Sequence, residues 1–199
     1  MNPRWHKLLK EYIEALILAL ILALIIRAFV IQAFKIPSGS MKNTLLIGDH
    51  LLVNKFIYGI HIPFSDYVIP IKDPRHGDII VFEYPEDPEK DFIKRIIGVP
   101  GDTIEIRDKE VYRNSEKLVE PYARHTDPAI VEGLRDNLPA FVVPENSYFV
   151  MGDNRDESYD SRWWKFVRRD QIRGKAWRIY WSWESLSNIR FDRMGQAVQ

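Results

Sequence analysis

The sequence predicts a mainly β protein in which an antiparallel, barrel-like domain follows a single N-terminal transmembrane helix. The first observation is an apolar stretch that fills most of residues 12–34. The second is that the rest of the chain consists of short runs rich in β-branched and aromatic residues, separated by Gly, Pro and Asp turns. The 199 residues leave room for one such domain of about 150 residues with a sizeable core.

The composition excludes several classes of function. Lys plus Arg and Asp plus Glu both number 28, so the net charge is zero and no nucleic-acid partner is expected. The chain has no cysteine, which rules out thiol catalysis, disulfide bonds and cysteine-based zinc sites. The five histidines are scattered and no His-Glu-x-x-His motif occurs, so we expect neither a metal site nor a cofactor.

The apolar stretch is long enough to cross a membrane once. It is uninterrupted over residues 15–26, and three polar residues divide the rest of it: Glu14, Arg27 and Gln32. As a helix, residues 12–34 would extend over about 34 Å, against a hydrocarbon core of about 30 Å. Basic residues precede it at Arg4, Lys7 and Lys10. The positive-inside rule therefore places residues 1–11 in the cytoplasm and residues 35–199 outside.

A cleavable signal peptide and a buried core helix are the alternatives for this stretch. No small-x-small cleavage site follows the apolar block directly, which favours an anchor that is retained. The stretch also lacks a polar face, which suits lipid better than a protein core. We therefore expect a transmembrane anchor over residues 12–34.

Beyond the anchor, the pattern predicts β-strands joined by short turns. The expected strands are 45–47, 51–53, 78–84, 91–99, 103–107, 110–113, 141–143, 147–151 and 175–183. The first two are joined by a turn at 48–49, and a turn-rich segment occupies 63–77. Residues at about 105–145 are expected to form a small inserted lobe. The last strand is expected to place one set of side chains on a single face: Trp177, Ile179, Trp181 and Trp183.

A bend with two serines follows the anchor at residues 36–41, with the sequence IPSGSM. Pro37 restricts the residue before it to extended geometry, and Gly39 permits a backbone angle that other residues resist. A sharp bend of this kind can aim the hydroxyl of Ser38 or Ser40. On its own the Pro-Ser-Gly-Ser segment favours a linker between an anchor and a domain, because Ser, Gly and Pro dominate ordinary loops.

Lys94 is unusual because it lies within an otherwise apolar strand. Such a lysine either extends its amine to the solvent or is buried with a lowered pKa. At the usual pKa of about 10.4, only about one lysine in 2,500 is neutral at pH 7, and burial is the direct way to increase that fraction. A neutral Lys94 amine within reach of Ser40 would form a Ser-Lys dyad. A Ser-His-Asp triad that uses His50 or His76 stays open as the alternative.

A third polar cluster occupies residues 152–162. It is either a solvated loop or the braced wall of a site. In the second interpretation, Arg155 and Arg162 pair with neighbouring acidic residues of the cluster, namely Asp153, Asp156 or Asp160. Ser158 would then offer a hydroxyl that orients a neutral amine.

Together these segments resemble the type I signal peptidases, the membrane-anchored leader peptidases of bacteria. The matching stretches, in the family's order, are IPSGSM at 36–41 with Thr44 and Leu45, RHGDI at 75–79, KRIIGVPGD at 94–102, and residues 152–162. They follow the anchor and cover the remaining chain except for the lobe. One such motif would be weak evidence, whereas four in order are highly specific. Many members have proline where this chain has Asn43, so the turn after Ser40 is expected to be less rigid here.

The resemblance implies a membrane-bound serine endopeptidase that needs no cofactor. Ser40 would be the nucleophile and Lys94 the general base, and the Ser40 amide with the Ser38 hydroxyl would form the oxyanion hole. The resemblance also implies supporting roles for Ser158, which would orient the Lys94 amine, and for an ion pair of Asp160 and Arg162. The residues that would line the substrate cleft are Ile36, Pro37, Met41, Leu45, Val81, Phe92 and Ile93.

The substrate implied by the resemblance is the signal peptide of an exported preprotein, bound as an added strand and cut after a small residue. The implied location is the inner membrane of a bacterium, with the catalytic domain extracytoplasmic or periplasmic, in contact with lipid and near the secretion translocon. The C-terminal tryptophans would either enter the lipid surface or fill the core.

Two other hypotheses compete with signal peptide cleavage. A self-cleaving protease of the SOS-repressor type has a similar Ser-Lys site, but it would be cytoplasmic, and the anchor argues against it. The second alternative is a non-enzymatic β domain, tethered to the membrane, that binds an extracytoplasmic partner and uses the serine-containing bend as a linker.

Overall fold

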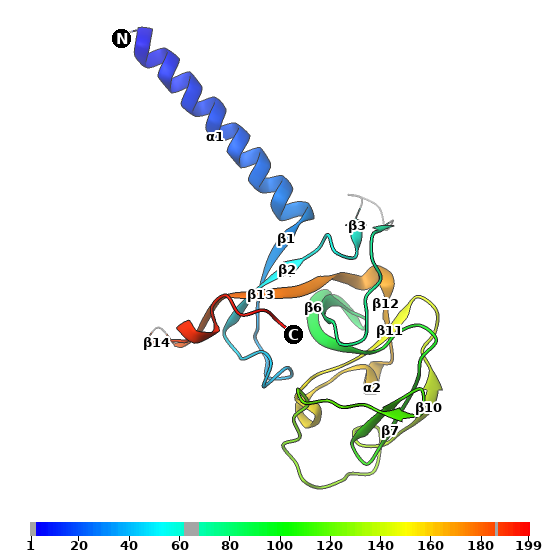
Figure 1. Ribbon diagram of the computed structural model, residues 1–199. Coiled ribbons are helices and arrows are strands. Elements are labelled where there is room, and N and C mark those ends of the chain that lie inside the picture. Colours follow the sequence, from blue (N-terminus) through cyan, green and yellow to red (C-terminus); the bar gives the residue numbers. More distant parts are fainter. Residues whose placement is uncertain (1–2, 62–67, 186) are drawn as a thin grey trace.

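The computed structural model describes residues 3–61, 68–185 and 187–199, and within them the chain is mainly β (Figure 1). The helices are α1 (Pro3–Phe29) and α2 (Ser161–Trp164), and 3₁₀ turns occupy Arg155–Glu157, Arg169–Gln171 and Phe191–Arg193. The strands are β1 (Ile31–Lys35), β2 (Asp49–Asn54), β3 (Gly59–His61), β4 (Val68–Pro70), β5 (Ile79–Tyr84), β6 (Asp87–Gly98), β7 (Thr103–Arg107), β8 (Glu110–Arg113), β9 (Glu116–Lys117), β10 (Leu138–Val142), β11 (Ser147–Met151), β12 (Val167–Arg168), β13 (Ile172–Ser185) and β14 (Asn188–Ile189). Residues 63–67 of the predicted turn-rich segment lie outside the described residues.

The largest sheet has the order β1-β2-β13-β5-β6-β11-β12, with β14 paired to β13. A smaller sheet, β10-β7-β8-β9, forms the lobe, and β3 pairs with β4. The strand pairs are antiparallel, which confirms the predicted fold class. The long strand β13 crosses the domain and joins the β1–β2 part to the β5–β6 part (Figure 1). The segment after β1 and the middle of β6 therefore belong to one framework.

Helix α1 extends away from the sheets (Figure 1). Its described apolar side chains are exposed, including Leu8, Leu9, Ile13, Leu16, Ile17, Leu20, Ile21 and Leu24. Among the described residues, no helix combines the length and the apolar character that crossing a membrane requires. The helix ends at Phe29 rather than at residue 34, because residues 31–34 belong to β1, where Ile31 lies opposite Asn54 and Phe34 opposite Leu51 of β2.

Two pairs of neighbouring strands form hairpins. Strand β5 pairs with β6, and β7 pairs with β8 across Asp108 and Lys109. Both turn residues have positive φ angles, 49° and 73°, as a two-residue turn between twisted strands requires.

Two predictions about the strands were wrong. Residues 45–47 form turns rather than a strand, because Leu45 donates its N–H back to Met41 O at 2.8 Å and Leu46 donates to the Asp49 carboxylate at 2.8 Å. The single tryptophan face of the last strand is also absent. The pairing of β13 with β2 is irregular at two places, so that Trp177 is 46% exposed while Ile179 is buried.

Three apolar clusters fill the interior. The first lies between β5, β6, β11 and α2 and contains Phe82, Ile96, Val150 and Trp164. The second packs the segment after β1 against β2 and β13, through Ile36, Met41, Leu45, Leu51 and Ile179. The third joins the end of β6 to the lobe, through Ile97, Ile104, Val111 and Phe149. The second cluster anchors the serine-containing bend, because Ile36 and Met41 at its two ends belong to that cluster.

Candidate active site

The structure brings Ser40 and Lys94 together, as the sequence predicts. Lys94 Nζ lies 2.7 Å from Ser40 Oγ, although the two residues are 54 positions apart in the chain. Both side chains are buried, with 8% of Ser40 and 4% of Lys94 exposed. As an ammonium, Lys94 donates this hydrogen bond. As a neutral amine, it can accept the Ser40 hydroxyl proton across the same contact.

Each member of this pair is placed by its own element. Lys94 lies in β6 opposite Ile80 of β5, and its neighbour Arg95 lies opposite Met151 of β11, so β6 is paired on both sides from Arg95 onward. Ser40 lies in a turn anchored by the buried side chains of Ile36 and Met41. The φ angle of Gly39 is outside the left-handed region, contrary to the role predicted for it. A Cβ at that position would instead meet the Lys42 side chain, 2.9 Å away.

Burial changes the acidity of Lys94. Desolvation is the largest effect on it and lowers its pKa from 10.5 to about 8, while the charge of Asp160 opposes this shift. The Phe92 ring, whose centroid is 5.4 Å from Nζ, forms part of the apolar surroundings. Lys94 can therefore be neutral in an appreciable fraction of molecules near neutral pH, which a general base requires.

The bend that carries Ser40 is supported from behind by residues 152–154. Asn154 donates its backbone N–H to Ser40 O at 3.0 Å and its side-chain amide to Gly39 O at 3.0 Å. At Gly152 the backbone passes so close that a Cβ would lie 2.5 Å from Ser40 O and would overlap Ser158 Oγ. Glycine is therefore required at this position, because any side chain would displace the nucleophile segment.

Buried ion pairs surround the dyad. Arg95, next to Lys94, donates through Nε and Nη2 to Asp153 at 2.8 and 2.7 Å. Arg162 pairs with Asp160 at 2.9 Å, as predicted, and Asp160 also caps α2 by accepting the Arg162 backbone N–H. Arg155 does not pair within the 152–162 cluster. It pairs with Glu120 of the lobe at 2.6 Å, so its predicted pairing was wrong.

Asp156 likewise pairs outside the cluster, with Lys109 at 3.0 Å. Burial alone would raise the pKa of Asp156, but the Asp127 backbone N–H and Lys109 outweigh it and lower the pKa to about 2. Local sequence spacing could not reveal either of these lobe partners.

A cleft of about 370 Å³ opens beside Ser40 and Lys94. Of the residues expected to line it, Pro37, Phe92 and Ile93 do so. Three others are buried in the interior, namely Met41, Leu45 and Val81. Sequence analysis missed further lining residues, which are Gly39, Asp91, Glu157 and Tyr159. Glu157 and Tyr159 lie in the polar cluster at 152–162, and Asp91 lies three residues before Lys94. The polar cluster and the strand that carries Lys94 are therefore the sequence signals that could have identified these three residues.

Ser38 and Ser158, the two other serines predicted for the site, differ in their exposure to solvent. Ser38 is exposed and lines the cleft beside Ser40, where its hydroxyl is accessible to a bound group. Ser158 is buried, and its Oγ has no hydrogen-bond partner among the described residues. The structure therefore places a hydroxyl against Gly152 behind the dyad, without a hydrogen bond to Lys94.

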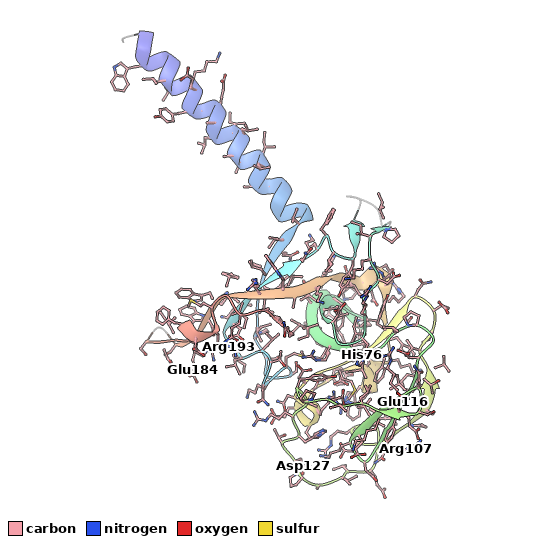
Figure 2. The ribbon with its side chains drawn as sticks, in the orientation of Figure 1. His76, Arg107, Glu116, Asp127, Glu184 and Arg193 are labelled. Atoms are coloured by element: carbon pink, nitrogen blue, oxygen red, sulfur yellow. The ribbon has the colours of Figure 1, made fainter. Side chains whose placement is uncertain are left out.

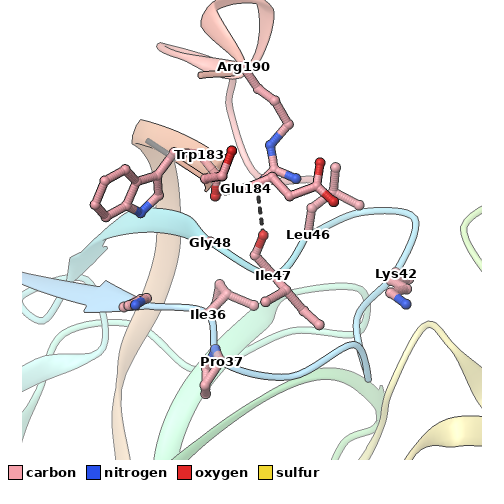
Figure 3. A pocket seen from close by; sticks show the side chains of 11 residues that line it. Ile36, Pro37, Lys42, Leu46, Ile47, Gly48, Trp183, Glu184 and Arg190 are labelled. Atoms are coloured by element: carbon pink, nitrogen blue, oxygen red, sulfur yellow. Dashed lines mark hydrogen bonds between the residues drawn. The ribbon is translucent and has the colours of Figure 1, made fainter. Parts of the chain in front are cut away.

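A second hollow, of about 730 Å³, shares Pro37 with the cleft. Figure 3 shows it between the Ile36 to Gly48 segment and the end of β13, where Arg190 donates to Ile47 O at 2.7 Å. Ile36, predicted to line the substrate cleft, is buried and contributes to this second hollow instead.

The histidines considered for a triad lie elsewhere. His76 Nδ1 contacts Ile97 O at 2.9 Å, and the His50 ring packs against Tyr180 and Trp183. Neither of them lines the cleft. No group of three or more His, Cys, Asp or Glu residues that could hold a metal ion occurs in the part of the chain that the structure describes.

Comparisons with known proteins find signal peptidases. A family model described as "Signal peptidase, peptidase S26" matches residues 9–181. Signal peptidase I of Pseudomonas aeruginosa is 40% identical over 94% of this chain and 79% of its own length. A probable signal peptidase I-1 of Synechocystis is 42% identical over 87% of this chain and 83% of its own length. A crystal structure of a signal peptidase I from Enterococcus faecalis is 33% identical and covers 53% of this chain and 97% of its own, with a TM-score of 0.42.

Proposed function

The chain belongs to the signal peptidase family, peptidase S26, and on that premise we propose that Ser40 and Lys94 are its catalytic dyad. The family membership identifies a serine peptidase that removes signal peptides from preproteins. It leaves the hypothesis of a non-enzymatic tethered domain without support. The observation that carries the residue assignment is the 2.7 Å contact between a buried amine and a buried hydroxyl at the floor of a cleft.

The proposed reaction begins when the neutral Lys94 amine takes the proton of Ser40. Ser40 Oγ then attacks the carbonyl carbon of a small residue of the preprotein, the residue that precedes the cut. The oxyanion of the tetrahedral intermediate receives hydrogen bonds from the Ser40 N–H and the Ser38 hydroxyl. Lys94 returns its proton to the leaving amine, and an acyl-enzyme remains. A water molecule then gives a proton to Lys94 and attacks this ester. The ester bond to Ser40 Oγ breaks, and Lys94 returns the proton to Ser40 Oγ, which restores both groups.

The preprotein is proposed to lie in the cleft as an extended strand beside β6. Pro37, Phe92 and Ile93 contribute apolar side chains to the lining of the cleft. The cleft has a volume of about 370 Å³, and we propose that its apolar lining contacts the small residues next to the cut. Of the residues predicted to bind the substrate, the proposal keeps the three that line the cleft, which are Pro37, Phe92 and Ile93.

The same proposal extends to the membrane. Members of the family are membrane-associated in bacteria. Helix α1 and its exposed apolar side chains support its assignment as a single anchor, with residues 1–11 cytoplasmic and the β domain extracytoplasmic, in contact with lipid and near the translocon. Trp177 of β13 is exposed, and we propose that it contacts the lipid surface. Release of the full-length protein from membranes by alkaline carbonate would contradict this assignment.

The dyad is tested with a purified preprotein and the full-length enzyme in detergent. Ser40→Ala and Lys94→Met are expected to be folded and inactive. Lys90→Met is the matched control, because Lys90 lies in the same strand but is exposed and pairs with Asp87. It should cleave at the wild-type rate. Cleavage by Lys94→Met would place the general base elsewhere.

A further inference from the structure

The inserted lobe contacts the segment that supports the nucleophile. Residues 118–137 connect β9 to β10, and within them Arg124 forms a parallel bridge with Asn154. Arg124 donates its N–H to Asp153 O at 2.7 Å, and Arg155 donates its N–H to Arg124 O at 2.9 Å. This part of the lobe therefore runs beside Asp153, Asn154 and Arg155 as an added strand would.

The supporting segment in turn contacts the nucleophile. Asp153 and Arg155, on either side of Asn154, make the hydrogen bonds to Arg124, and Asn154 itself donates to the carbonyls of Gly39 and Ser40. A displacement of the lobe would consequently be transmitted to Ser40 through one intervening residue. The connection consists of three backbone hydrogen bonds and one from the Asn154 side-chain amide, and such bonds are directional.

A side-chain clamp fixes this arrangement. Glu120 accepts two hydrogen bonds from Arg155, at 2.8 Å from Nη1 and 2.6 Å from Nη2, and the side chains are 9% and 2% exposed. Arg155 Nε also donates to Gly152 O at 3.2 Å. Bidentate pairing of this kind fixes the orientation of the guanidinium plane as well as its distance. The clamp thus joins Glu120 to the glycine that lies against Ser40.

Tyr122 connects the clamp to the lysine side of the dyad. Its hydroxyl donates to Glu120 at 3.0 Å, and its ring lies 3.8 Å from the centre of the Arg95 guanidinium. Arg95 is the chain neighbour of Lys94 and pairs with Asp153. The same two lobe residues therefore touch the supports of both catalytic groups.

We propose that Glu120 and Tyr122 are positioning residues, through which the lobe sets the relative placement of Ser40 and Lys94. This inference rests on the proposed dyad. Further contacts hold the lobe to the same cluster, among them the Lys109 pair with Asp156, the hydrogen bond from the Asp127 N–H to Asp156 and the hydrogen bond from Arg162 to the Arg135 carbonyl. The lobe is accordingly part of the catalytic framework as well as a packing unit.

The outer face of the lobe supplies a matched control. Figure 2 shows Arg107, Glu116 and Asp127 spread over the lobe. Glu110 of β8 pairs with Lys117 on its exposed surface, with side chains 46% and 56% exposed. Glu110→Gln therefore removes a lobe carboxylate and one ion pair, as Glu120→Gln does, but without touching residues 152–155.

The test compares Glu120→Gln, Tyr122→Phe and Glu110→Gln with the wild type, as full-length enzymes in detergent. For each, kcat and KM are measured with a purified preprotein, together with the melting temperature. Acylation by p-nitrophenyl acetate is followed separately, because this small ester reaches the nucleophile without filling the cleft. We expect Glu120→Gln to lower kcat at least tenfold with KM within twofold, and to slow acylation by the same factor. Tyr122→Phe should have a smaller effect in the same direction, and Glu110→Gln none.

Other results would overturn the inference. A lower melting temperature with unchanged kcat for the folded enzyme would make Glu120 merely structural, and a raised KM with unchanged ester acylation would make the lobe a substrate-docking surface. If Glu120→Gln does not fold, Tyr122→Phe decides by the same criteria. Ser40→Ala in the same series separates this inference from the dyad. Cleavage by Ser40→Ala overturns both, whereas an inactive Ser40→Ala with unchanged lobe variants overturns only the role of the lobe.

Discussion

Replacing Lys94 by methionine is expected to make the protein inactive but more stable at neutral pH. The amine is 4% exposed and has no carboxylate within hydrogen-bond distance among the described residues. Folding must therefore bury a group that is charged at pH 7 in the unfolded chain. Methionine fills a similar volume without a charge, so the variant avoids this desolvation penalty.

The size of the effect follows from the pKa of Lys94, which burial lowers from 10.5 to about 8. This difference corresponds to about 3 kcal/mol against folding when the group is protonated in both states. Loss of the hydrogen bond to Ser40 offsets about 1 kcal/mol of the gain. The net stabilisation at pH 7 is about 2 kcal/mol, or about 4–8 °C in melting temperature for a domain of this size.

The pH dependence of this gain has a definite sign. Below pH 8 both states hold the proton, and the full penalty of the wild type applies. Between about pH 8 and 10.5 the folded state has lost the proton that the unfolded state still binds, so wild-type stability rises with pH. The advantage of Lys94→Met should therefore disappear near pH 10. Thermal melting of the wild type and of Lys94→Met at pH 7 and pH 10 measures this difference in stability, and Lys90→Met serves as the exposed control. A variant less stable than the wild type at pH 7, or an advantage that persists at pH 10, would refute the reasoning.

Three further outcomes are expected. The kcat/KM of the wild type should rise about tenfold from pH 7 to pH 9, since the neutral fraction of Lys94 increases from about one tenth to about nine tenths, and a flat profile would contradict this. Gly152→Ala should lower kcat at least a hundredfold in preprotein cleavage, because its Cβ would lie 2.5 Å from Ser40 O. Asp160→Asn should lower stability by about 3 kcal/mol in thermal melting, since it leaves a buried guanidinium unpaired. It should also shift the pH profile to lower pH, because this carboxylate raises the pKa of Lys94.

The sequence was sufficient to identify the groups that the structure brings together at the dyad. Ser40 and Lys94 stand out locally, one on a Pro-Gly bend and the other as a charge within an apolar run. Hairpins with short turns were equally predictable, because their partners are neighbours in the chain. These features depend on residues that are close to one another in the chain.

Features that depend on distant partners could not be predicted in this way. Arg155 pairs with Glu120, 35 positions away, in a stretch without periodicity, so nothing local distinguishes it from the acidic residues beside it. Irregular pairing within β13 reversed the expected side of Trp177. Met41 and Leu45 have the apolar character of cleft residues, but the same character suits the core that anchors the bend, and only tertiary packing decides between the two.

The buried basic residues separate into two chemical kinds. Three arginines, each less than 5% exposed, pair with carboxylates: Arg95 with Asp153, Arg155 with Glu120 and Arg162 with Asp160. Lys94 is buried to the same extent, yet its polar contact among the described residues is the Ser40 hydroxyl. A carboxylate in direct contact would hold the lysine protonated and remove the base, whereas arginine stays charged in any case and can serve as structural support. The fold thus assigns permanent charge to arginine and leaves the titratable amine without a counter-ion, as proton transfer from Ser40 requires.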